Sequence, residues 1–280
     1  MKRKSRFILF LIFGALPLAL HAELETVGQE TQNVFSGGNK KIPDIFQNPT
    51  DKNFEAKIRA RIFQATSATA VLLKEFDWKK LEVLPRQTVF ESARLDVPAV
   101  RAETKFVVQW LDNSNVLGAT EVWVYPTNLL WELRLLAGNQ PIGVFDPQNE
   151  LKPLLKNLRI DFDDLGEIGV ANFTGKLAII GAFPSKSQMP DDLPKQIKLL
   201  AKKNTAVVWI LPEKTAREDA RPTKLLPSFY SVPEKQIAVV VVQPDFISDL
   251  SKNPRSQLNL IYFCKLALNL QSPAGPDFSP

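Results

Sequence analysis

The stretch that decides the fold of the C-terminal half of the chain is G-K-L-A-I-I-G-A-F, from Gly175 to Phe183. Its centre, L-A-I-I, is a continuous apolar run without alternation, which is typical of a strand covered on both faces in a parallel sheet. Similar runs occur at residues 142–145, 206–211 and 237–242. Because segments with helical periodicity separate these runs, the sequence predicts an α/β domain with a doubly wound, mostly parallel sheet.

The chain opens with the pattern of an export signal. Four basic residues lie within positions 2–6, an apolar segment covers residues 7–20, and Leu20-His21-Ala22 fits a cleavage site. Gly14 and Pro17 interrupt the apolar segment, which is too short for a stable membrane span. We therefore expect residues 1–22 to be a signal peptide and the mature protein to be periplasmic or extracellular. An uncleaved anchor is the alternative.

The charge balance gives no reason to expect a nucleic-acid partner. The chain has 35 Lys and Arg against 30 Asp and Glu. Four of the basic residues belong to the predicted signal peptide, so 31 remain against 30 and the mature chain carries a net charge of +1. The basicity belongs mainly to the export signal, whereas nucleic-acid binding needs a basic surface on the folded domain.

The histidine and cysteine counts exclude several kinds of catalytic site. The only histidine, His21, leaves with the predicted signal peptide. A mature chain without histidine can hold neither a Ser-His-Asp or Cys-His arrangement nor a His-ligated metal. Cys264 is the only cysteine, so no internal disulfide can form, and its apolar surroundings predict a small core residue.

The N-terminal half reads as a leader followed by a β-domain. Residues 23–52 are polar and lack regular apolar spacing, so we expect a flexible leader. From residue 53 apolar and charged residues alternate, and shorter runs follow at 81–84, 88–90, 105–111 and 119–125. Turn residues at 112–115 indicate a hairpin. Residues 53–126 therefore predict a small antiparallel β-sandwich of immunoglobulin-like architecture.

Residues 127–272 form the predicted α/β domain, and residues 273–280 a tail. Besides the runs above, a strand is predicted at 159–162. Helices are predicted at 129–137, at 150–158, at 191–203 and from Asn253-Pro254 onward, with Gly138 ending the first of them. The prolines within residues 212–235 indicate a long surface excursion.

The order of segments in this half resembles a known family. G-V-F-D-P-Q-N-E-L-K-P-L-L, G-K-L-A-I-I-G, L-P-K-Q-I-K-L-L-A-K-K-N-T-A-V-V-W-I and I-A-V-V-V-V-Q-P-D-F follow one another before a Leu-rich helix. This order is similar to class I glutamine-amidotransferase-like domains, which are flavodoxin-like. It is most similar to the degenerate versions attached to β-domains in exported bacterial proteins. The resemblance covers roughly residues 128 to 270 and rests on pattern.

The sequence departs from the active members of that family at the catalytic position. The resemblance places a nucleophilic Cys after the third strand, where this chain reads Gly181-Ala182-Phe183-Pro184-Ser185. The partner His is also missing, so the family's hydrolytic activity is not carried over and no catalytic residue is predicted.

Polar residues near the ends of the first and third strands are the candidate ligand site. Open α/β sheets bind ligands at the carboxyl ends of their strands. The residues concerned are Asp146, Gln148, Asn149, Ser185 and Gln188. Asp146, Asp163, Asp164 and Asp245 also offer a divalent-cation site, against the alternative that Asp146 caps a helix and the others are solvated. Anionic cofactors bind through backbone N–H groups after the first strand, but here Asp146 supplies a negative carboxylate and Pro147 has no N–H. We therefore expect no anionic cofactor, and no cofactor is predicted.

Two aromatic residues, Trp123 and Tyr125, share the face of a predicted strand opposite Val122 and Val124. The sequence favours a sheet face covered by the neighbouring domain. The alternative is an exposed pair that stacks on sugars or meets a protein partner.

The sequence thus favours a non-catalytic, exported binding or assembly module whose partner is another protein of the cell envelope. The alternatives are a binder of a small ligand, carbohydrate or divalent cation, or a carboxylate-based enzyme, acting at the crevice of the α/β sheet.

Overall fold

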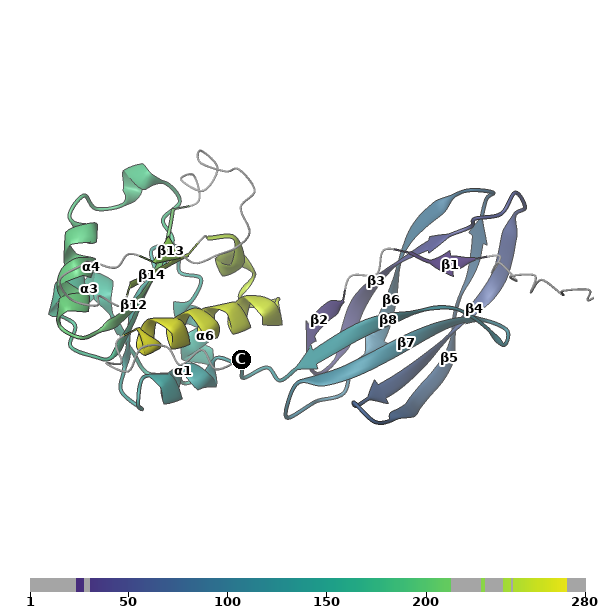
Figure 1. Ribbon diagram of the computed structural model, residues 1–280, viewed down its shortest axis with the longest axis horizontal. Helices are drawn as coiled ribbons and strands as arrows, with labels where there is room; N and C mark the ends of the chain where they lie inside the picture. Colours follow the sequence, from purple (N-terminus) through teal and green to yellow (C-terminus); the bar gives the residue numbers. More distant parts are fainter. Residues whose placement is uncertain (1–23, 28–30, 213–227, 230–238, 243, 271–280) are drawn as a thin grey trace, which may run out of the picture.

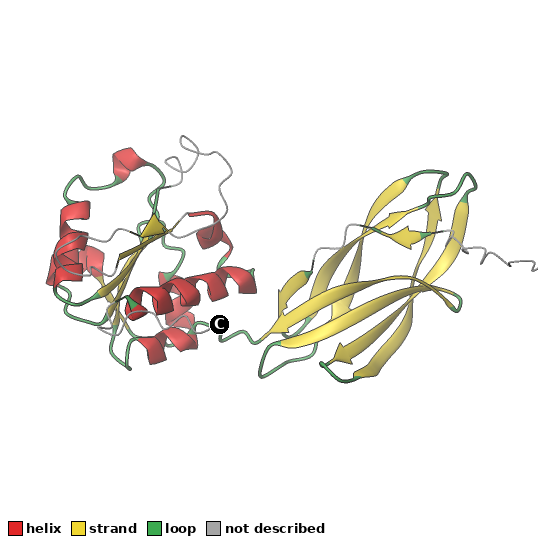
Figure 2. Cartoon of the chain, in the orientation of Figure 1, coloured by secondary structure: helices red, strands yellow, loops and turns green. Residues whose placement is uncertain are grey.

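The computed structural model describes residues 24–27, 31–212, 228–229, 239–242 and 244–270. A β-domain is followed by a domain that carries all the described helices, and the two lie end to end (Figures 1 and 2). The predicted signal peptide (1–22), the tail (273–280) and most of the proline-rich excursion lie outside the described residues. The mixed α/β class predicted from the sequence is confirmed.

Two sheets make up the β-domain, in the strand orders β1-β3-β6 and β2-β8-β7-β4-β5. Their apolar faces share one core, which includes Phe46 from the first sheet and Ile58 and Trp110 from the second. The strands are β1 (Glu25–Thr26), β2 (Gln32–Phe35), β3 (Asn39–Gln47), β4 (Phe54–Ala65), β5 (Ala70–Val83), β6 (Thr88–Asp96), β7 (Thr104–Asp112) and β8 (Asn115–Tyr125).

The interpretation of residues 23–52 as a flexible leader was wrong. β3 pairs with β6 over nine residues of each strand, and β2 pairs with β8. Every second residue of β3 points into the core, but one of these inward positions is Asp44, between Ile42 and Phe46. A buried carboxylate in the inward row, with Pro43 beside it, hides the alternation on which strand prediction depends.

The second domain is built on one sheet with the strand order β10-β9-β11-β12-β14-β13. All its pairings are parallel except that of β13. The four residues of β11 have no exposed surface, in agreement with the unbroken apolar run. The strands are β9 (Ile142–Phe145), β10 (Phe162–Asp164), β11 (Leu177–Ile180), β12 (Ala206–Ile210), β13 (Ser228–Phe229) and β14 (Val239–Val242).

Helices cover both faces of this sheet (Figure 1). Residues of α1 (Trp131–Leu136), α2 (Lys152–Asn157) and α6 (Pro254–Asn269) share a core with one face. Residues of α3 (Leu165–Ile168) and α4 (Leu193–Lys202) share a core with the other. Short 3₁₀ segments complete the fold at η1 (Val170–Asn172), η2 (Lys186–Gln188) and η3 (Pro244–Asp249). No helix within the described residues combines the length and the hydropathy needed to cross a bilayer.

The predicted strand at 159–162 begins three residues too early. Residues 159 and 160 instead end α2, because the N–H of Ile160 donates to Leu155 O at 2.9 Å and the N–H of Arg159 donates to Lys156 O at 3.1 Å. Other terminal signals were correct. Gly138 has φ +68° at the end of α1, and the Asn253 side chain accepts from the N–H of Arg255 at the start of α6.

Leu133 tests the packing of α1, the helix that follows the β-domain. Its side chain has no exposed surface and lies in the core shared with α6. We expect Leu133→Ala to lower the free energy of unfolding by about 2–5 kcal/mol, measured by urea denaturation. Leu135→Ala on the same helix is the control, since Leu135 is 71% exposed and should change stability by only about 0.5 kcal/mol. Equal effects of the two changes would contradict the buried packing of α1.

A buried polar chain joins the two sheets of the β-domain. Trp110 Nε1 donates to Thr120 Oγ1 at 2.9 Å, and that hydroxyl donates to Asp44 Oδ2 at 2.7 Å. The N–H of Ile45 donates to Asp44 Oδ1. Burial raises the pKa of Asp44 above its ordinary value, although these hydrogen bonds act to lower it. The protonated carboxyl therefore fits the folded core better than the carboxylate does.

Asp44→Asn should reveal this burial as a pH dependence. A raised folded-state pKa gives stability that is present below the ordinary value of 3.8 and is lost as pH rises through the folded-state pKa. The stability of the wild type relative to Asp44→Asn should therefore fall with rising pH, measured by urea denaturation from acid to neutral pH. Asp51→Asn is the control with the opposite slope, because a hydrogen bond from Arg86 lowers the pKa of exposed Asp51. Parallel slopes for both variants would refute the burial argument.

Candidate functional site

The strand order places the expected ligand position between β9 and β11. The chain moves outward from β9 to β10 and then returns past β9 to β11, so the direction of winding reverses there. In open α/β sheets the crevice at the carboxyl ends of such a strand pair is where ligands bind. The residues that follow β9 and β11 are therefore the first place to look for a site.

Asp146, which follows β9, is committed to the protein's own backbone. Its carboxylate accepts hydrogen bonds from the N–H groups of Glu150, Leu151 and Lys152 at 2.8–3.2 Å. The residue is 7% exposed. Asp146 therefore stabilises the first turn of α2, which is the capping role weighed above against metal binding.

The loop after β11 closes against the loop after β9. The N–H of Gly181 donates to Phe145 O at 2.5 Å, and a Cβ at position 181 would lie 3.0 Å from that same oxygen. Ala182 and Phe183 are buried, with the rings of Phe183 and Phe145 5.7 Å apart. The residues that follow β11, Ala182 and Phe183, are thus packed into the core.

The remaining crevice candidates lie around this closed centre. Asn149 is exposed with φ +55°, and Gln148 is half-buried. Ser185 is half-buried and its hydroxyl lies 2.9 Å from that of Ser187, whereas Gln188 is exposed in η2. The structure places Asp146, Gln148 and Asn149 on one turn and Ser185 and Gln188 on another.

Two of the four carboxylates proposed for a cation, Asp146 and Asp164, have other partners. Asp164 caps α3 through the N–H of Gly166 and pairs with Lys152 Nζ at 2.5 Å. Burial acts to raise the pKa of Asp164, but these hydrogen bonds and the Lys152 charge outweigh it and hold the pKa below its ordinary value. The side chain of Asp245 lies outside the described residues. Among the described residues no group of three His, Cys, Asp or Glu side chains is arranged to hold a metal.

The alternative of an exposed Trp123 and Tyr125 pair was wrong for Tyr125, which is 6% exposed. Its hydroxyl lies 3.2 Å from Glu103 Oε1 and 3.4 Å from Asn33 Oδ1. Asn33 belongs to β2, the strand that the sequence analysis placed in a flexible leader. Trp123 is half-buried and Lys105 Nζ lies 5.9 Å from its ring centre. The two residues do not form a flat aromatic platform.

A wider pocket lies in the α/β domain, at the surface where α1 and the C-terminal end of α2 meet. It is an open depression of about 640 Å³. The indole of Trp131 and the side chain of Leu135, one turn apart on α1, are 55% and 71% exposed. Ile160 is 4% exposed and belongs to the apolar floor, with Leu158 beside it. We call this depression the α1–α2 pocket.

Trp131 is held in place by its polar edge. The indole Nε1 donates to Leu158 O at 2.9 Å, which ties α1 to the end of α2. Because the only donor of the indole is used, the exposed part of the ring is an apolar surface. Leu135 lies four residues later, so both side chains fall on one side of the helix.

The pocket carries more positive charge than negative charge. Arg134 and Arg159 line it and are exposed, and neither guanidinium forms a salt bridge with another described residue. Glu132 also lines it, but its carboxylate pairs with Lys265 Nζ of α6 at 2.6 Å. The pocket therefore presents two positive charges beside apolar surface, with its one acid neutralised.

Arg159 occupies a backbone position that favours glycine. The two hydrogen bonds that end α2 form a Schellman motif with Arg159 at C′ and φ +55°. α1 ends in the same motif, where the N–H groups of Gly138 and Asn139 donate to Leu135 O and Arg134 O. There the C′ position is Gly138, the residue expected from the sterics of the left-handed region.

Arg159→Gly should make the protein more stable. A non-glycine residue in the left-handed region costs about 1–2 kcal/mol, and part of that gain is offset by the greater chain entropy of glycine when unfolded. We expect the free energy of unfolding to rise by about 0.5–1 kcal/mol, measured by urea denaturation. Arg134→Gly is the control, since glycine inside α1 should lower stability by about 1 kcal/mol. A destabilising Arg159→Gly would mean that the guanidinium stabilises the fold.

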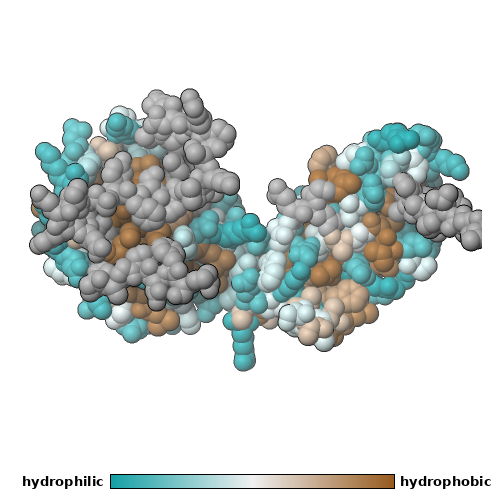
Figure 3. Space-filling model, in the orientation of Figure 1, coloured by the Kyte–Doolittle hydropathy of each residue, from teal (hydrophilic) through white to brown (hydrophobic). Residues whose placement is uncertain are grey.

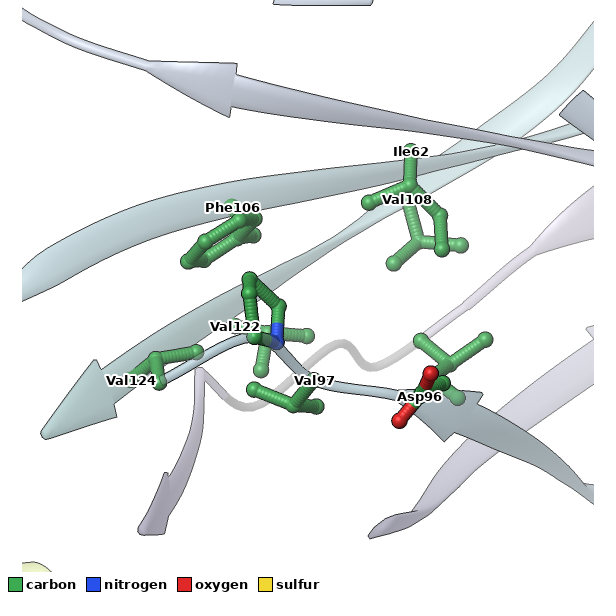
Figure 4. A pocket seen from close by; sticks show the side chains of 9 residues that line it. Ile62, Asp96, Val97, Phe106, Val108, Val122 and Val124 are labelled. Atoms are coloured by element: carbon green, nitrogen blue, oxygen red, sulfur yellow. The ribbon is translucent and has the colours of Figure 1, made fainter. Parts of the chain in front are cut away.

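Two other features of the β-domain do not form a site. A gap of about 20 Å³ is enclosed by apolar side chains that include Ile62, Phe106 and Val122 (Figure 4). It is too small for more than a water molecule and offers such a molecule few polar partners. Val71, Leu72 and Leu73 of β5 are about half exposed, but consecutive residues of a strand point to opposite faces, so the three do not form one apolar patch. Figure 3 shows hydrophobic and hydrophilic residues interspersed on the visible face of the β-domain. β5 is an edge strand interrupted by bulges, which disfavours strand addition.

The α1–α2 pocket was not predicted from the sequence although a signal was present. Leu130 and Leu133 are buried, which leaves Trp131 and Leu135 on the outer side of α1. Two large apolar residues four positions apart on the outer face of a short helix are the signal. The role of Arg159 could not be seen, because its position depended on where α2 ends.

Comparison with known proteins leaves the family open. No family model matches the sequence, and no curated protein matches it. Solved structures align weakly over part of the chain. The Pseudomonas fluorescens alkylpurine DNA glycosylase AlkC has 14% identity over 37% of this chain and 31% of its own, with a TM-score of 0.31. Sporulation control protein Spo0M of Bacillus subtilis has 9% identity over 42% of this chain and 54% of its own, with a TM-score of 0.28. This chain thus spans well under two thirds of the matched structures, and similarity of this degree supports no functional argument.

Proposed function

We propose that this protein is a non-catalytic, exported binding or assembly module of the cell envelope that acts through contact with another protein. The observation that carries the proposal is the closed centre of the α/β sheet. A flavodoxin-like domain binds its ligand at this end of the sheet. Here the Gly181 N–H donates a hydrogen bond to Phe145 O, and the Asp146 carboxylate accepts hydrogen bonds from three backbone N–H groups. The Gly181 N–H and the Asp146 carboxylate are therefore both used in hydrogen bonds within the fold.

The proposal includes a degenerate amidotransferase-like domain behind an immunoglobulin-like β-domain. In its support, the parallel strands taken in chain order give the arrangement 2-1-3-4-5, the flavodoxin-like order. Buried Ala182 and Phe183 replace the nucleophile turn of that family. Cys264, the only cysteine, is fully buried, and burial raises the pKa of its thiol, so the thiolate needed for nucleophilic attack is disfavoured.

A small-ligand or carboxylate-enzyme function is the alternative carried over from the sequence. Of its candidate residues, Asn149, Ser185 and Gln188 keep surface that a ligand can reach. The carbohydrate version has lost half of its platform, because Tyr125 is buried. The protein-binding proposal is better supported, since the α1–α2 pocket offers exposed aromatic and aliphatic surface.

The experiment measures turnover and assembly on the same mature protein. Release of ammonia from glutamine and hydrolysis of p-nitrophenyl esters should not exceed the buffer rate, for either the wild type or Ser185→Ala. Native electrophoresis of the solubilised envelope should show the tagged protein in a complex with a different protein. Turnover that disappears in Ser185→Ala would reject the proposal, and migration as the free chain would favour the small-ligand alternative.

A further inference from the structure

We propose that the α1–α2 pocket docks an acidic segment of a partner protein, with a bulky apolar side chain of that segment seated against Trp131 and Leu135. The inference deepens the proposed function and rests on it, since it names the surface and the chemistry of the partner.

The apolar wall is exposed and yet fixed. Trp131 Nε1 is bonded to Leu158 O at 2.9 Å, so the indole is held at one edge while 55% of the residue stays open to solvent. A held aromatic residue loses little conformational entropy when a partner covers it, which is why Trp is frequent among residues that dominate binding energy. Leu135 extends the same surface.

The charges select the sign of the partner. Arg134 comes from α1 and Arg159 from the end of α2, so the guanidiniums approach the pocket from two separate elements. Within the part of the chain described by the structure neither forms a salt bridge, while the Glu132 carboxylate is paired with Lys265. Guanidinium groups bind carboxylates through paired N–H donors, so aspartate or glutamate beside the apolar side chain complements this pocket.

The backbone at Arg159 supports a role for its side chain outside the fold. The same helix-ending motif carries glycine at Gly138, yet at the pocket it carries arginine with φ +55°. The left-handed backbone ends α2, but the side chain of Arg159 is exposed and contributes no ion pair to the described structure, so the fold does not require arginine at this position. Strain of this kind is characteristic of binding sites.

The pocket's own shape and charge argue against two other occupants. A second copy bound through the same surface would set two positively charged pockets against each other, which opposes a symmetric dimer. A bilayer surface is flat, whereas buried Ile160 lies at the floor of a depression of about 640 Å³. A side chain that projects from a peptide reaches this floor.

The experiment measures peptide binding to the mature protein by fluorescence anisotropy. The probe is fluorescein-labelled Gly-Asp-Glu-Phe-Asp-Glu-Gly. It is compared with a neutral peptide that has Asn and Gln in place of Asp and Glu, a lysine peptide that has Lys in place of the acidic residues, and a peptide that has Gly in place of Phe. We expect the acidic Phe peptide to bind at least about ten-fold more tightly than each of the others, and its affinity to fall as salt is raised. Arg134→Glu with Arg159→Glu should abolish the preference.

The control reverses two charges elsewhere on the same domain. Lys195 and Lys198 are exposed on α4, which covers the other face of the sheet, and Lys195→Glu with Lys198→Glu should leave binding unchanged. Arg159→Gly adds a variant that keeps or gains stability, so weaker binding by it cannot be ascribed to misfolding. Trp131→Ala should also weaken binding.

Several results would overturn the inference. These are equal affinity for the neutral or lysine peptides, binding unaffected by the double reversal at Arg134 and Arg159, and a concentration-dependent dimer that Leu135→Asp dissociates. Binding to phosphatidylglycerol vesicles through the same two arginines would also overturn the inference. The peptide assay does not measure turnover. A negative result in it rejects only this inference, whereas enzymatic turnover in the separate assay would reject the proposed function.

Discussion

The α/β domain depends on the burial of its sheet from both sides. A strand such as β11, with no exposed residue, is stable only when side chains cover it above and below, because every apolar group left in water weakens the fold. α1, α2 and α6 supply one cover and α3 and α4 the other. The positions of the helix ends, and therefore the α1–α2 pocket, follow from this requirement.

The same close packing explains why the usual ligand crevice is closed. The loops after β9 and β11 approach until the Gly181 N–H reaches Phe145 O, and glycine is required there because a Cβ would press on that oxygen. The carboxylate of Asp146 accepts a hydrogen bond from the N–H of Leu151 and so caps the start of α2. Gly181 and Asp146 are thus held by contacts within the domain at the ends of β11 and β9.

In the β-domain the equivalent constraint is the polar chain from Trp110 through Thr120 to Asp44. It crosses the core and ties β7 and β8 of one sheet to β3 of the other. A buried carboxyl is costly unless its oxygens are bonded, and here both accept hydrogen bonds. This interaction ties β3, and with it the sheet β1-β3-β6, to the second sheet of the domain.

The sequence by itself determined the features that depend on neighbours along the chain. The unbroken apolar runs identified β9, β11, β12 and β14, and the caps at Asn253 and Gly138 marked helix ends, because period and terminal residues act locally. The sequence also showed that histidine occurs only at His21 and that the single cysteine, Cys264, lies in an apolar segment. Only the tertiary structure decided the rest. The buried Asp44 hid the apolar alternation of β3. Tyr125 is buried beside β2, a strand distant in sequence, and the position of Arg159 depends on where α2 ends. Each outcome rests on contacts between segments that no local pattern records.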